Sequence, residues 1–225
     1  MIVSIDIAQL GPKRGLRLLA KKPSPGEVDG LRYAETLFTA PLATSVPKPS
    51  LGTVALLAAW DDDAALDRFA EHPLGRELSS GWQARMEPLR VSGAWPEMPG
   101  LPEKQLPVDA EEPVAVLTLG RPKPWRVRPF LRASAPAEAD AVAEPGLLAS
   151  TAFARLPGLV STFSLWRTAA AMRDYAYRQG GSHRAAVAAD RSRPFHRASA
   201  FIRFRPYATR GQCGQFEPLR RGSEA

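Results

Sequence analysis

Histidine is the residue type in this sequence best suited to holding a metal ion or a cofactor iron, and the chain has three: His72, His183 and His196. None has a second histidine or a cysteine at zinc-ligand spacing, which argues against a zinc site. The patterns HExxH, GxSxG, GxGxxG and the P-loop are also absent, which removes the common motif-bearing hydrolases and nucleotide enzymes. A haem iron, in contrast, needs only one protein ligand, and a neutral histidine is sufficient.

His183 has the most suitable surroundings for such a ligand. Gly180-Gly181 can end one helix, and Ser182 can cap a second helix that places His183 at its first position. The residues that follow, Ala185–Ala188, are small and leave room beside the imidazole for something flat and large. The alternative is a histidine at the start of a helix that faces solvent.

Other reactive side chains have simpler interpretations. His72 precedes Pro73 and His196 follows Pro194-Phe195, both in turn-like sequence, which predicts surface positions. Cys213 follows the last expected strand and reads as a flexible thiol, with a thiolate haem ligand as the alternative. The acidic run at 61–63 precedes an expected helix, where capping and the helix dipole explain it.

Composition indicates a globular protein of 225 residues that is 44% hydrophobic and 24% charged. No apolar run approaches the roughly 18 residues that a membrane span needs, and the start lacks the pattern of a signal peptide. The single cysteine excludes an internal disulfide framework. We therefore expect a cytoplasmic protein.

The net charge of +7 is unevenly distributed along the chain. Residues 1–120 hold 12 basic and 16 acidic side chains, whereas residues 121–225 hold 18 and 7. The arginines are scattered and form no basic helix, zinc knuckle or aromatic RNA-binding strand, so we expect no nucleic-acid partner. The basic half suits the acidic groups of a cofactor, an acidic redox partner or a membrane surface.

An internal repeat organises the chain. Residues 53–70, TVALLAAWDDDAALDRFA, are echoed by residues 161–177, STFSLWRTAAAMRDYAY, with Trp60 and Trp166 in register at an offset of 106. Each copy reads as a strand that ends at the tryptophan and leads into an alanine-rich helix. Repeats of this kind indicate a duplicated structural unit.

The pattern around each copy predicts the βαββαβ order of a ferredoxin-like unit. We expect an α+β protein in which two such tandem halves bury their sheet faces against each other as an intramolecular barrel pseudo-dimer. The alternative is two independent domains without a shared core. The predicted divisions are an N-terminal half at 1–95, a Pro-rich linker at 96–112, a C-terminal half at 113–210 and a flexible tail at 211–225.

Long segments of the chain resemble a known family. The run SLWRTAAAMRDYAY, then residues 183–187, then FIRFRPY resemble the C-terminal half of the spheroidene monooxygenase-like family. The first-half run from VALLAAWDDDAALDRFAEHPLGREL to EPLRVSGAW is similar to that family's N-terminal half. The resemblance covers about residues 30–207, but where members tend to show an aromatic-then-acidic stretch before the last strand, this chain has RPFHRASA.

The resemblance implies an oxygenase that places a keto group on an acyclic carotenoid, using dioxygen and reducing equivalents. It also implies haem b and a fold similar to dimeric α+β barrel haem proteins, with His183 as the iron ligand and arginines of the basic half paired with the haem propionates. The candidate cofactor-pocket residues, each also suited to core packing, are Phe153, Phe163, Trp166, Met172 and Tyr177.

We therefore expect a haem-dependent monooxygenase acting on an apolar substrate of carotenoid type, supplied with electrons by a ferredoxin-type donor. The alternatives are a cofactor-free ferredoxin-like monooxygenase of natural-product biosynthesis, a haem or hydrophobic-ligand carrier without enzymatic activity, and a purely structural barrel. The sequence leaves peripheral membrane contact and a homodimer open.

Overall fold

A computed structural model of the chain describes residues 1–20, 22–42, 50–155 and 158–219. The first half contains β1 (Ile2–Gln9), α1 (Pro12–Ala20), β2 (Leu31–Ala40), β3 (Ser50–Trp60), α2 (Asp63–Ala70), α3 (Pro73–Leu78) and β4 (Trp82–Gly93). The second contains β5 (Val114–Pro122), the 3-10 turn η1 (Pro124–Arg126), α4 (Val127–Val142), β6 (Leu147–Arg155), β7 (Leu159–Trp166), α5 (Ala169–Tyr177), α6 (Ser182–Ser192) and β8 (His196–Arg210). The expected ends of β3 and β7 at tryptophan are confirmed.

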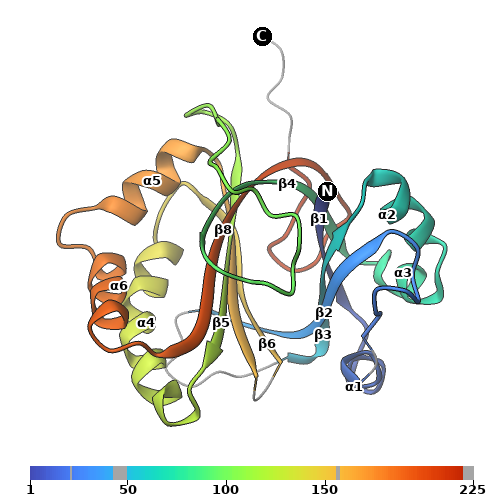
Figure 1. Cartoon of the computed structure of the whole chain (residues 1–225), viewed down its shortest axis with the longest axis horizontal. Coiled ribbons are helices and arrows are strands. Elements are labelled where there is room, and N and C mark those ends of the chain that lie inside the picture. Colours follow the sequence, from blue (N-terminus) through green and yellow to red (C-terminus); the bar gives the residue numbers. More distant parts are fainter. Residues whose placement is uncertain (21, 43–49, 156–157, 220–225) are drawn as a thin grey trace.

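The strands form one closed antiparallel barrel in the order β1-β3-β2-β6-β7-β5-β8-β4. Two joints connect the halves of the chain: β4 pairs with β8 along residues 83–93, and β2 pairs with β6 over Phe38–Ala40 and Ala152–Ala154. Helices α1–α3 lie on one side of the barrel and α4–α6 on the opposite side (Figure 1). The expectation of an α+β barrel is confirmed.

Side chains fill the barrel interior. Inward positions alternate along each strand as the pleat requires, and the rings inside include those of Trp82, Phe153, Phe163 and Phe216. Phe216 comes from the segment after β8 and is 4% exposed, and the indole of Trp82 donates to the Glu217 carbonyl at 3.0 Å. The sequence predicted a flexible tail at 211–225; within its described part, Phe216 lies in the barrel core, and Cys213 and Leu219 pack against that core.

The helix starts follow simple capping rules, with one correction. The Asp62 carboxylate accepts from the Ala65 amide at 2.9 Å, so the acidic run at 61–63 begins α2 as expected. The prediction that Ser182 caps α6 was wrong: Gly181 holds the cap position, because the backbone of Ser182 is already helical. His183 is consequently the second residue of α6. Within the described ranges, no helix is long and apolar enough to cross a membrane.

A buried carboxyl group under the helices of the first half gives a prediction for stability. The Asp6 carboxyl is 4% exposed and accepts hydrogen bonds from Gln83 and Ser4, and the Trp60 indole donates to the Ser4 hydroxyl at 3.0 Å. Burial raises the pKa of Asp6 to about 6, although these hydrogen bonds oppose the shift. Between about pH 4 and pH 6 the folded state therefore holds a proton that the unfolded state has released, and the free energy of unfolding falls as the pH rises.

We expect Asp6→Asn to remove this pH dependence, because asparagine mimics the protonated carboxyl. A shift of about two pKa units corresponds to about 3 kcal/mol, which the variant should gain relative to the wild type above pH 6. Urea unfolding at pH 4, 6 and 8 measures the difference. Equal pH profiles for the two proteins would contradict the assignment.

Candidate functional site

The helices of the two halves cover the outer faces of their sheets to different extents. In the first half, β1 and β3 are buried on both faces, because the apolar run Val54–Trp60 also packs outward against α1 and α2. In the second half, several outer positions of β5 and β7 are only half-buried, among them Val116, Thr118 and Thr162. Phe201, on the outer face of β8, is 42% exposed. The helices α4–α6 thus leave the outer face of the second sheet incompletely covered.

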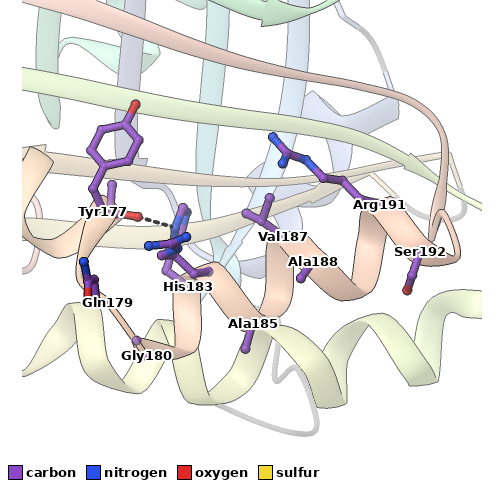
Figure 2. A pocket seen from close by; sticks show the side chains of 12 residues that line it. Tyr177, Gln179, Gly180, His183, Ala185, Val187, Ala188, Arg191 and Ser192 are labelled. Atoms are coloured by element: carbon purple, nitrogen blue, oxygen red, sulfur yellow. Dashed lines mark hydrogen bonds between the residues drawn. The ribbon is translucent and has the colours of Figure 1, made fainter.

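A partly open cavity of about 1240 Å³ lies on this side of the molecule, and the residues that line it all belong to the segment 176–192, from the end of α5 through α6. Tyr177, His183, Val187 and Arg191 line it, and Figure 2 shows Tyr177, Val187 and Arg191 directed to one side of α6, away from Ala185. The spacing of 183, 187 and 191 places these residues on one helical face. The volume exceeds the usual range of about 300–1,000 Å³ for small-molecule and cofactor sites.

The His183 imidazole is held in a defined state at this cavity. Its Nδ1 lies 3.1 Å from the carbonyl oxygen of Ala176, the contact dashed in Figure 2. Burial lowers the pKa of His183, which keeps the ring neutral at pH 7, although the hydrogen bond opposes the shift. Because a carbonyl can only accept, Nδ1 carries the proton and Nε2 keeps a free lone pair. Among the described residues, Nε2 has no hydrogen-bond partner, so it is available as a ligand.

An aromatic side chain packs against the His183 ring. The Tyr175 ring lies 5.4 Å from the His183 ring and stacks on Trp166 at 5.2 Å. Its hydroxyl donates to the carbonyl of Ala137 on α4 at 2.7 Å, and burial raises the pKa of Tyr175, so the hydroxyl keeps its proton. Residues on β7, α5 and α4 thereby fix the position of the imidazole.

The five predicted pocket residues do not lie together. Phe153 and Phe163 point into the barrel, whereas Trp166 and Met172 pack in a small outer cluster between β7 and α5. Tyr177 is 61% exposed and is the one of the five that lines the cavity with His183. The assignment of all five to a cofactor pocket stays a prediction, and the geometry gives the first four a packing role.

His196 is not the surface residue that its sequence context suggested. Its side chain is 11% exposed, and its ring lies 4.7 Å from the Phe130 ring. It fits against β5 because a side chain at Gly120 would collide with it. Nδ1 lies 3.6 Å from an Asp190 oxygen, beyond hydrogen-bond distance, and both ring nitrogens lack a hydrogen-bond partner in the described part of the chain. Only the pairing of β5 with β8 reveals this contact, so no local sequence signal could have found it.

The remaining candidates lie elsewhere. His72 is exposed, as predicted, and its Nδ1 accepts from the Leu74 amide at the start of α3. Cys213 packs at the end of the barrel, and burial raises its pKa, which disfavours a thiolate ligand. In the residues that the structure describes, no group of three or more His, Cys, Asp or Glu side chains could hold a metal ion.

The cavity at α6 fits a haem in three respects. It is large enough, it has one neutral imidazole with a free Nε2, and that imidazole has its Nδ1 tied to a backbone carbonyl, which is the usual way that proteins orient a histidine ligand. Val187 and Ala188 supply apolar wall beside the histidine. Among the lining residues His183 is the only histidine, and a haem iron requires only one protein ligand.

Comparisons with solved structures give low similarity. An aldoxime dehydratase is 10% identical, covering 91% of this chain and 80% of its own, with a TM-score of 0.48. A ferredoxin-fold protein related to antibiotic biosynthesis monooxygenases from Listeria monocytogenes is 13% identical, covering 91% and 94%, with a TM-score of 0.35. Both TM-scores are below 0.5.

Sequence relatives are more informative, although no protein-family model matches the chain. The spheroidene monooxygenase of Rubrivivax gelatinosus is 30% identical over 199 residues, 84% of this chain and 73% of that protein. The spheroidene monooxygenase of Cereibacter sphaeroides is 26% identical over 181 residues, 77% of this chain, and the match spans about half of that protein, 55%. On the strength of the first match, the chain belongs to the spheroidene monooxygenase family of oxidoreductases.

Proposed function

We propose that this protein is a haem-dependent monooxygenase that inserts oxygen into an apolar substrate of carotenoid type. The observation that carries the proposal is the His183 imidazole, neutral and with its Nε2 free, beside a cavity of about 1240 Å³. Haem b bound there would supply the activation of dioxygen, which protein side chains alone do not perform. The names of the two relatives suggest the carotenoid substrate.

In this proposal the protein supplies the ligand, the apolar wall and the orientation of the substrate. His183 holds the iron, and Tyr175 and the Ala176 carbonyl hold His183. Val187 and Ala188 limit the access of water on one side. Electrons would come from a ferredoxin-type donor, whose acidic surface suits the basic residues of the second half.

The proposal includes the architecture. Two tandem ferredoxin-like halves, residues 1–95 and 113–210 joined by the linker 96–112, would form an intramolecular pseudo-dimer. The repeated order of strands and helices supports this duplication. The first copy would serve as scaffold, since the outer faces of β1 and β3 are packed against helices, and the second would hold the cofactor.

The test uses protein produced with a haem precursor. We expect a strong Soret band and, with an acyclic carotenoid in detergent, a ferredoxin-type donor and isotopically labelled dioxygen, a keto product that carries the label. Mass spectrometry of the extracted pigment measures the incorporation. Colourless protein that still oxidises an electron-rich aromatic compound would favour cofactor-free chemistry instead, and coloured protein without any turnover would favour a carrier.

A further inference from the structure

Arg203 on β8 is the most unusual charged side chain near the cavity. It is half-buried on the outer face of the second sheet, where its Nη2 lies 3.9 Å from the Met172 sulfur. Burial lowers the pKa of Arg203, and the charges of Arg90 and Arg173 act in the same direction, whereas Tyr177 opposes them. Its surroundings are therefore positive, although it is partly removed from water.

Three guanidinium groups gather here without an acidic partner. Arg90 on β4 is the direct register partner of Arg203 on β8, so the two like charges face each other across neighbouring strands. Such a pair is destabilising by itself. Arg173 extends the group from α5, the helix that also carries Met172. In the described residues, none of the three has a carboxylate within 4.0 Å.

The neighbouring arginines show that this lack of pairing is specific to the site. Two residues along the same strand, Arg205 makes ion pairs with Glu87 and Glu112. On β4, Arg85 makes ion pairs with Asp63 and Asp67. Half-buried arginines on this surface are thus normally neutralised by the protein itself, and Arg203 is left for an anion that the protein does not supply.

The arginine group formed by Arg203, Arg90 and Arg173 lies close to the cavity. Tyr177 lines the cavity and also interacts with Arg203, which places Arg203 near the Tyr177 end of the cavity. A molecule in the cavity could therefore place an apolar body along α6 and an acidic group against β8. The planar guanidinium matches a carboxylate in shape and can bind it through two hydrogen bonds.

We propose that Arg203, flanked by Arg90 and Arg173, binds a carboxylate group of the molecule that occupies the cavity. This inference rests on the cavity of the proposed function but not on iron binding by His183. The carboxylate belongs either to a haem propionate or to an apolar carboxylic acid, and the two sources share the same chemistry.

The experiment uses metal-free protoporphyrin IX, because without iron the His183 ligand cannot contribute to binding. Quenching of tryptophan fluorescence gives the affinity of the haem-free protein for the porphyrin and for its dimethyl ester. We expect the wild type to prefer the free acid about tenfold, Arg203→Gln to lose that preference, and Arg173→Gln to lose part of it. Arg132→Gln on the exposed side of α4 is the matched control and should leave the preference unchanged.

A second pair of probes, palmitate and its methyl ester, separates the two sources. If the protein prefers the free-acid porphyrin to its ester and this preference depends on Arg203, the site binds a propionate. If an Arg203-dependent preference for the acid is seen only with palmitate, the site binds an acidic substrate. Equal acid-to-ester ratios in wild type and Arg203→Gln for both pairs would overturn the proposal. Failure of the His183 assignment would not alter these ratios, so the two proposals are tested separately. Arg203→Lys provides a second variant if glutamine destabilises the fold.

Discussion

His183→Ala is expected to lower the affinity of the protein for haem at least about 100-fold, because the change removes the iron ligand itself, whereas loss of a supporting partner alone costs about 10- to 100-fold. His183 is the only imidazole, carboxylate or thiol among the residues that line the cavity, and the Tyr177 phenol is the one other lining group of a type that can ligate haem iron. Titration with haem, followed at the Soret band, measures the change. The imidazole makes one hydrogen bond and is half-buried, so the variant should remain folded.

Two other histidines provide the controls. His72→Asn retains an acceptor at the start of α3 and should leave haem binding unchanged. His196→Ala tests the competing candidate, since both nitrogens of that buried ring lack a partner in the described part of the chain. A Soret band that survives His183→Ala and disappears in His196→Ala would move the ligand from α6 to β8.

Phe163→Ala is expected to destabilise the protein by about 3–5 kcal/mol, the usual cost of removing a fully buried phenylalanine ring. The ring lies between those of Trp82, Phe153 and Phe216, at centroid distances of 6.0 to 6.3 Å, and it is 0% exposed. The barrel wall cannot collapse around the lost volume without breaking strand pairing. Urea unfolding at pH 7 measures the loss.

The same variant separates a packing role from a cofactor role. Phe201→Ala, at a position on β8 that is 42% exposed, is the matched control and should cost less than about 1 kcal/mol. If Phe163 only packs the barrel, the haem affinity of its alanine variant, measured under conditions where the variant is fully folded, should equal that of the wild type. A selective loss of haem affinity with little change in stability would return Phe163 to the cofactor pocket.

The strands and their order along the chain could largely be predicted from the sequence, because the patterns that mark them are local. The repeat at Trp60 and Trp166 marks the ends of β3 and β7, and the alternating or continuous apolar runs mark the strands themselves. The interior rings from distant strands, such as Trp82 and Phe163, could not be paired in advance. Their contact depends on the joint between β4 and β8, which no local pattern specifies.

The candidate site could be predicted only in part. The sequence indicated His183 through its glycine and alanine neighbours, but it grouped Phe153 and Phe163 with Tyr177, although the barrel wall separates them. One available signal was missed: LVSTFSLW in β7 contains the polar residues Ser161, Thr162 and Ser164, whereas VALLAAW in β3 is apolar throughout. That contrast predicts that one outer sheet face is packed and the other is left for a ligand.

The two joints between the halves differ in length, and this difference determines where the barrel opens locally. The joint between β4 and β8 extends from Gln83 to Gly93, whereas the described pairing of β2 with β6 covers only Phe38–Ala40 and Ala152–Ala154. We therefore expect backbone amides at the short joint to exchange with solvent through small local openings, and those at the long joint to exchange mainly when the whole barrel unfolds. An opening confined to the short joint exposes two strand edges while the long joint stays intact, which is the geometry from which two copies of a chain exchange strands.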